Sequence, residues 1–97
     1  MAVYVDFLID YGWKYGPSCH MMADEMEELF LFAESIGLKR SWLDDKAGSL
    51  VPHFDLTRGK RELALKKGAI EITDRKTLAE IIDRLRYVFH GEKGRKA

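Results

Sequence analysis

A chain of 97 residues is long enough for one domain and too short for two of ordinary size. Its hydrophobic fraction of 46% and charged fraction of 33% are typical of a folded globular protein and exclude a disordered one. A formal net charge of 0 gives the whole molecule no electrostatic attraction to DNA or membranes, and no basic face is long enough for sequence-specific DNA binding.

The single cysteine, Cys19, excludes an intrachain disulfide and fits a reducing compartment. The N-terminal segment carries Asp6 and no basic stretch, so it does not have the pattern of a secretory signal peptide. No apolar run approaches the roughly 20 residues that span a bilayer. We therefore expect a cytoplasmic protein with no membrane partner.

Hydrophobic periodicity predicts three strands that alternate with three helices. β-branched and aromatic residues mark the strands, apolar residues at helical spacing mark the helices, and glycines end them. Asp24 and Thr57 are the expected N-caps of the first two helices. In chain order the predicted elements are a strand over 2–8, a loop over 10–18, a helix over 24–36, a strand over 38–43, a loop over 44–52, an extended segment over 53–56, a helix over 57–67, a strand over 69–73, a helix over 74–90 and a mobile polar tail over 92–97.

This βαβαβα order predicts an α/β fold, namely one small three-layer domain over residues 1–91 with a short, mainly parallel sheet and helices packed on it. In open sheets of this kind, ligands bind at the carboxyl ends of the strands. That rule gathers Asp6, the 10–18 loop, Trp42 and the 53–61 segment at one end of the sheet. Because a three-stranded sheet is small, we also expect a homo-oligomer that extends or covers it.

The charged residues are segregated along the chain. All ionisable residues over 22–36 are acidic, whereas the 57–67 segment has five basic residues and one acidic residue. Two helix faces that attract one another would explain this pattern, and so would a local anion site. Thr57 begins a helix, and Lys60 and Arg61 lie in its first turn, where cations are unfavourable unless an anion is present. This local conflict predicts a phosphate site.

Acidic and histidine side chains form a second group of candidates. Asp6 ends an apolar strand, where a carboxylate is costly unless it is paired or binds a ligand, and a structural role explains it about equally well. His53 and Asp55 alternate along an extended segment, which suits a metal-ligand pair or a general base with its orienting carboxylate. His20 stands four residues before Asp24, so the two share a face if a helix has begun there.

Aromatic residues of the 10–18 loop, together with Trp42, could stack on a base or form a small satellite core over the sheet. Cys19 beside His20 is weak evidence for a nucleophile, and packing explains this cysteine better. Phosphate-loop, dinucleotide-binding, zinc-protease and serine-hydrolase motifs are absent from the sequence. The sequence therefore offers ligand-binding candidates without a complete catalytic motif.

Six segments follow one another in a recognisable order: VYVD, CHMMAD, ELFLFAESIGL, Trp42, PHFDLT and KRELALKKGAIEIT. In order and spacing they resemble domain-of-unknown-function family 4031, a family of short phage and bacterial proteins, across roughly residues 2–73. The resemblance implies a single domain and a phage or prophage origin, but it implies no activity. The positions of this pattern that carry functional groups are Asp6, Cys19, His20, Asp24, Trp42, His53, Asp55, Lys60 and Arg61.

The leading hypothesis is a phage-type accessory protein that binds a nucleotide-like phosphate ligand without turnover. Such a protein could sequester a host signalling nucleotide, for example an ADP-ribose derivative or a cyclic dinucleotide. No catalytic residue, resident metal or cofactor is expected under this hypothesis. The expected ligand-binding residues are Asp6, His20, Trp42, His53, Asp55, Thr57, Lys60 and Arg61.

Two alternatives remain. The first is a metal-dependent phosphoesterase or nuclease with Mg²⁺ or Mn²⁺ held by Asp6, Asp24, His53 and Asp55, since carboxylates near strand ends suit that chemistry. The second is a module that binds a host protein through the acidic helix or the aromatic loop. Turnover that stops in EDTA would distinguish the first alternative from simple binding.

Overall fold

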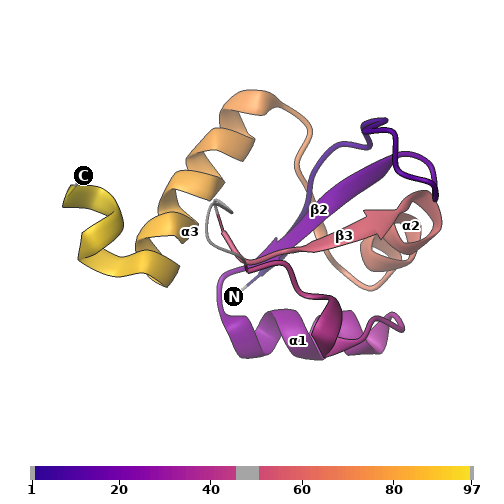
Figure 1. Ribbon diagram of the computed structural model, residues 1–97, viewed down its shortest axis with the longest axis horizontal. Helices are drawn as coiled ribbons and strands as arrows, with labels where there is room; N and C mark the ends of the chain where they lie inside the picture. The colour runs from indigo at the N-terminus through magenta and orange to yellow at the C-terminus, as the bar shows by residue number, and fades with distance from the viewer. Residues whose placement is uncertain (1, 46–50, 97) are drawn as a thin grey trace.

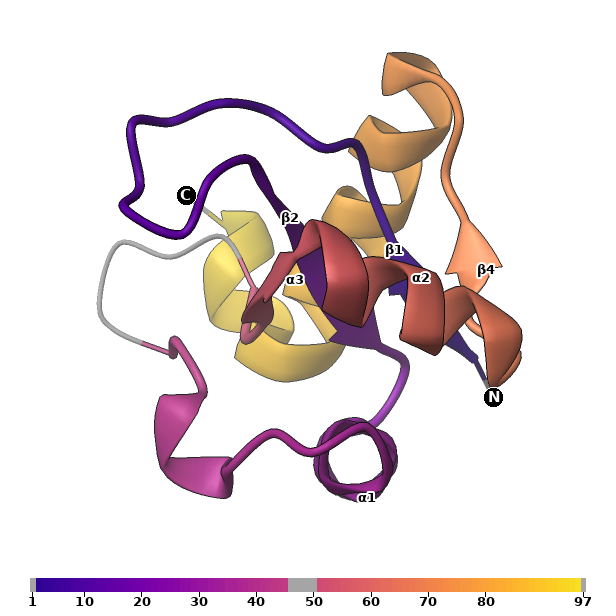
Figure 2. The same cartoon turned by 90° about the vertical axis from the view of Figure 1, so that its right-hand side faces the viewer.

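The computed structural model describes residues 2–45 and 51–96, with side chains as far as residue 90. Within these residues, four strands form one sheet, and helices lie on both of its faces (Figures 1 and 2). None of the described helices is long and apolar enough to cross a membrane. In chain order the elements are β1 (Val3–Val5), β2 (Ser18–Ala23), α1 (Met26–Ser35), a 3-10 turn η1 (Arg40–Trp42), β3 (Phe54–Thr57), α2 (Arg58–Lys66), β4 (Ile70–Glu71) and α3 (Arg75–Lys96).

The sheet has the strand order β3-β2-β1-β4 and is mostly antiparallel. β2 pairs antiparallel with both β1 and β3, and among the described strands the β1–β4 pair alone is parallel. The α/β class is confirmed, but the prediction of a mainly parallel sheet in βαβαβα order is wrong. The error comes from β2, because the predicted loop ends at residue 18, the predicted helix begins at residue 24, and no strand was expected between them.

Residues 18–23 form a strand because they pair with neighbours on both sides. As the second strand of four, β2 is buried on both faces, so it lacks the polar alternation that marks a half-exposed strand. Met22 therefore lies on β2, before the predicted helix. Asp24 does not cap α1, because Glu25 occupies the N-cap position and makes no side-chain cap hydrogen bond.

The structure confirms two of the predicted helix boundaries and changes two other predicted elements. Gly37, with φ of 88°, ends the first helix as expected, and Thr57 caps α2 by accepting a hydrogen bond from the Lys60 backbone N–H. The strand expected over 38–43 is instead the turn η1, and α3 continues beyond Gly91 to its end at Lys96. Part of the loop expected over 44–52, residues 46–50, lies outside the described residues.

Alternation along the strands separates two apolar layers. On one face, side chains of odd-numbered β1 and β2 residues and of even-numbered β3 residues pack beneath α1 and α2: Val3, Val5, Cys19, Met21, Phe54 and Leu56. On the other face, Leu85 of α3 packs in one cluster with Tyr4, Met22, Val51 and Ile72. By the same alternation, His20 and Asp55 belong to the face on which α3 packs.

Asp24 attaches α3 to the sheet. Its carboxylate accepts hydrogen bonds from the Ala2 backbone N–H at 2.8 Å, from the Tyr4 hydroxyl at 3.0 Å and from Arg84 of α3 at 3.0 Å. Burial raises the pKa of this carboxyl, but the hydrogen bonds from Arg84, Tyr4 and Ala2 outweigh it, so the pKa is lowered overall. The residue therefore has a structural role in joining the N-terminal segment, β1 and α3.

Replacing Asp24 with asparagine is expected to lower the free energy of unfolding by about 2 kcal/mol at neutral pH, because charge-assisted hydrogen bonds are lost. A lowered folded-state pKa contributes stability that is present above the unfolded value of 3.8 and is lost as the pH falls through the folded value. The difference between the variant and the native protein should thus shrink in urea unfolding below that pH. A difference in unfolding free energy that stays constant as the pH falls below 3.8 contradicts this role. The matched control is Asp83→Asn, which makes the same substitution at an exposed position of α3.

Candidate functional site

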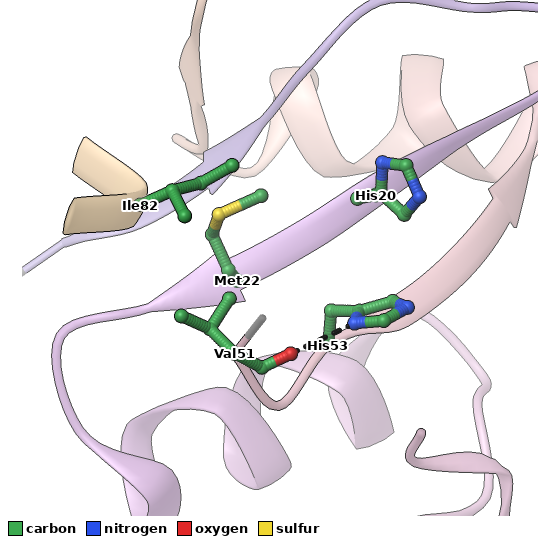
Figure 3. Close-up of a pocket in the computed structure, with 5 residues that line it drawn as sticks. All are labelled: His20, Met22, Val51, His53 and Ile82. Atoms are coloured by element: carbon green, nitrogen blue, oxygen red, sulfur yellow. Dashed lines mark hydrogen bonds between the residues drawn. The ribbon is translucent and has the colours of Figure 1, made fainter. Parts of the chain in front are cut away.

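The centre of the candidate site is a pair of histidines on neighbouring strands. His20 lies on β2, and His53 directly precedes β3; their ring centroids are 5.0 Å apart with an interplanar angle of 87° (Figure 3). Asp55 is the register partner of His20 across the β2–β3 pair. The period of two along a strand places His53 on the same face as Asp55, so the antiparallel pairing assembles all three side chains.

Asp6 orients the His20 ring. His20 Nδ1 donates to one carboxylate oxygen of Asp6 at 2.8 Å, and the His20 backbone N–H donates to the other at 2.6 Å. Asp6 is only 4% exposed, and burial of an unpaired carboxylate there would cost free energy. The two hydrogen bonds from His20 pair this carboxylate. The hydrogen bond that His20 donates to Asp6 outweighs burial and raises the pKa of His20.

His53 is oriented in an equivalent way. Its Nδ1 lies 2.9 Å from the Val51 carbonyl oxygen, which can only accept, so Nδ1 carries the proton and donates it. Its Nε2 lies 3.6 Å from a carboxylate oxygen of Asp44 and 3.6 Å from one of Asp55. Asp44 is brought there by an antiparallel backbone bridge to His53, in which each residue donates to the other.

This arrangement could hold a metal ion. One ligand atom from each of His20, His53 and Asp55 lies within 4.8 Å of the others. Since ligands at about 2.1 Å from one ion are at most ~4.2 Å apart, a shift of several tenths of an ångström would close the site, and the half-exposed Asp55 can supply it. A histidine ligand usually donates its second ring N–H to a carboxylate or carbonyl, as both do here. Two imidazoles with one carboxylate favour a transition metal over Mg²⁺.

An acidic cleft of about 420 Å³ opens beside the histidine pair. Neither a lysine nor an arginine is among its described lining residues, and two aromatic residues of the 10–18 loop form part of its wall. The two carboxylates of the described wall, those of Asp44 and Asp55, favour a cation beside the histidines. The lining of the cleft consists of Tyr11, Gly12, Trp13, Ser18, His20, Asp44, His53 and Asp55.

The residues expected to form a phosphate site at the start of α2 have partners within the protein. Lys60 Nζ donates to the Ile36 carbonyl at 2.6 Å, where it satisfies a carbonyl at the end of α1. Arg61 Nε donates to the Asp6 carbonyl at 2.9 Å, and its Nη2 donates to Glu71 at 3.0 Å. These acceptors resolve the conflict that motivated an anion at this helix start.

Two further candidates lie apart from the histidine pair. Trp42 lies on η1, is 55% exposed and is not among the described residues lining the cleft; the Lys39 ammonium lies 5.7 Å from its ring centroid. Asp24 binds Arg84 and Tyr4 at the attachment of α3. Of the four ligands expected under the metal-dependent alternative, His53 and Asp55 lie together, beside His20. Asp6 is bound to the far side of the His20 ring, and Asp24 lies apart.

Asp44 is the residue that sequence reasoning missed. It stands in a segment read as loop, nine positions before His53, and no local pattern links the two. An isolated backbone bridge across these nine positions brings the two residues together, and such pairing leaves no periodic signal. His53-x-Asp55 was recognised because its two members share a strand face.

Cys19 is not equipped to act as a nucleophile. The side chain is buried between the sheet and the helices, and burial raises the pKa of its thiol to about 12. Since the thiolate is the reactive form, the native protein should resist iodoacetamide at pH 8 and react rapidly after unfolding in urea. Alkylation of the folded protein at the rate of an exposed thiol would show that this assignment is wrong.

Fold and site together define a small α/β domain with a histidine–carboxylate centre on a mostly antiparallel sheet. Over residues 3–85 the chain matches the family described as protein of unknown function (DUF4031), and it belongs to that family. The match extends beyond the segments recognised in the sequence and includes part of α3. Comparisons with curated proteins and with solved structures found no match.

Proposed function

We propose that this protein binds a nucleotide-like phosphate ligand through a divalent transition-metal ion held by His20, His53 and Asp55. The observation that carries the proposal is the convergence of these three ligand atoms within 4.8 Å. Both imidazoles have Nδ1 engaged by an acceptor, which leaves the Nε2 lone pair of each neutral ring for a metal. The ligand set is thus already oriented.

The charge of the cleft explains why a metal ion would bind first and the phosphate second. Asp44 and Asp55 lie at the histidine pair, and no basic side chain is among the described residues of the cleft wall. A phosphate entering alone would meet carboxylates, whereas a divalent cation neutralises them and presents open coordination positions to phosphate oxygens. The rest of the ligand would contact the aromatic wall.

Hydrolysis of the bound phosphoester is a second candidate, favoured by the position of Asp44. Its carboxylate lies 3.6 Å from His53 Nε2, next to the proposed ion, where it could accept a proton from an attacking water. Water would then add to phosphorus and one P–O bond would break, so that a phosphodiester gives a phosphate monoester and an alcohol, and a diphosphate gives two monophosphates. Asp44→Asn should abolish such turnover while leaving metal binding largely intact.

Thermal unfolding with Mn²⁺ and nucleotides tests the proposal. A ligand at 100 times its dissociation constant raises the free energy of unfolding by about 2.7 kcal/mol. For a domain of this size, that raises the melting temperature by roughly 10 °C or more. The probes are Mn²⁺ alone, then Mn²⁺ with inorganic phosphate, an ADP-ribose derivative or a cyclic dinucleotide, each repeated in EDTA. A metal-dependent shift supports the proposal, and the absence of any shift with metal or phosphate refutes it.

The recovered ligand separates the two candidates. A nucleotide that chromatography returns intact supports retention without turnover, which is the behaviour required of a protein that sequesters a signalling nucleotide. A cyclic dinucleotide returned as the linear dinucleotide, or an ADP-ribose derivative returned as two monophosphates, supports hydrolysis. The variant His90→Gln, which changes an exposed histidine of α3, should behave like the native protein in both measurements.

A further inference from the structure

An apolar pocket of about 230 Å³ lies on the other side of the same histidine pair. Figure 3 shows His20 and His53 among the residues that line this pocket. The same two histidines line the acidic cleft, so the two spaces share the proposed metal ligands. Among the described residues, the remaining walls are Met22, Val51 and Ile82. A ligand anchored at the histidines could therefore extend in two chemically different directions.

The three apolar walls come from separate parts of the fold. Met22 follows His20 by two residues on β2 and shares its face, Val51 precedes His53, and Ile82 comes from α3. Met22 and Val51 are almost completely buried and belong to the apolar layer under α3. The pocket is therefore a gap at the edge of a packed layer rather than a wide surface depression.

The size and composition of the pocket limit what it can hold. Sites for whole drug-sized ligands measure about 300–1,000 Å³, so this pocket suits one ring of a ligand rather than the whole molecule. The Met22 thioether and the two imidazoles favour a flat aromatic ring, because sulfur–aromatic and edge-to-face contacts are favourable. Tyr11 and Trp13 on the cleft wall are the competing place for such a ring.

We propose that this pocket receives a flat aromatic or heteroaromatic ring of the ligand whose phosphate binds at the histidine centre, and that Ile82 limits the size of that ring. The inference rests on the proposed function and narrows its ligand to phosphate esters that carry a ring close to the phosphate. The pocket is favoured over the open aromatic wall because it encloses more of a ring, so that more of the ring's own apolar surface leaves water.

Calorimetric titration of the Mn²⁺-loaded protein with phenyl phosphate and methyl phosphate tests this inference. The two monoesters present the same phosphate group, so their difference reports the ring. We expect phenyl phosphate to bind about tenfold more tightly, as burial of a ring predicts. Ile82→Trp, which fills the pocket, should remove that advantage and leave methyl phosphate binding unchanged.

Two controls locate the ring. Val88→Trp adds the same bulk at an exposed position of α3 and should keep the tenfold preference. Trp13→Ala should also keep it; loss of the preference in this variant, together with its retention in Ile82→Trp, would overturn the inference. Ile82→Ala provides an independent reading, because a larger pocket should favour 1-naphthyl phosphate over phenyl phosphate, and an unchanged ratio would contradict the role of Ile82.

The failures of the two proposals are distinguishable. Equal affinities for phenyl and methyl phosphate would overturn the ring pocket and leave metal-dependent phosphate binding standing. If neither monoester binds the Mn²⁺-loaded protein, the proposed function fails and the ring pocket fails with it.

Discussion

Replacing His53 with glutamine is expected to weaken Zn²⁺ binding by more than about 100-fold. The change removes one of three ligand atoms, whereas loss of a residue that merely orients a ligand already costs about 10–100-fold. Asp6→Asn should fall in that smaller range, because Asp6 positions the His20 ring without being among the proposed ligands. Competition with a colorimetric zinc chelator measures both affinities.

His90→Gln is the matched control for this experiment. It makes the same substitution at an exposed position of α3 and should leave the Zn²⁺ affinity unchanged. Circular dichroism on each variant establishes that it is folded before affinities are compared. Native-like Zn²⁺ affinity in folded His53→Gln would rule out the metal centre, and with it the proposed route to phosphate.

Arg61→Ala is expected to lower the free energy of unfolding by about 3 kcal/mol. The side chain is only 14% exposed, and its guanidinium donates to the Asp6 carbonyl and to the Glu71 carboxylate. Arg61 thereby ties α2 to the end of β1 and to β4, and its removal leaves a part-buried carbonyl without this donor. Urea unfolding at neutral pH measures the change.

The same variant distinguishes a structural arginine from a phosphate-binding one. Arg58→Ala, one turn earlier on α2 and exposed, should change stability by less than about 0.5 kcal/mol. If Arg61→Ala keeps full stability but loses metal-independent binding of inorganic phosphate, the anion site at the start of α2 would be the better interpretation. The structural role is supported if Arg61→Ala loses stability and the native protein shows no metal-independent binding of phosphate.

Local signals in the sequence were sufficient for the helices and for half of the site. Gly37 and Thr57 act through their own backbone neighbourhoods, so the end of α1 and the start of α2 could be predicted. The alternation of His53 and Asp55 around the buried Phe54 is also local, because it needs only an extended backbone. These features required no knowledge of which segments lie side by side.

The strand β2 could not be predicted in this way. Its residues SCHMMA include good helix formers, and their burial on both faces removes the alternation that identifies a strand. Hydrogen bonding to β1 and β3 overrides that local preference. Because His20 was placed at a helix start, Asp24 was expected as its neighbour, whereas the antiparallel register makes Asp55 its partner.

The partners of the charged groups were likewise decided by the tertiary structure. In the sequence, Lys60 and Arg61 are cations near a helix N-terminus, where positive charge is unfavourable. In the fold, they donate hydrogen bonds to the backbone carbonyls of Ile36 and Asp6. Residue types and local spacing identified which side chains could carry chemistry, because propensity and periodicity act over a few residues. The assembly of the histidine pair with its carboxylates depends on strand pairing between distant segments, which only the folded chain brings into contact.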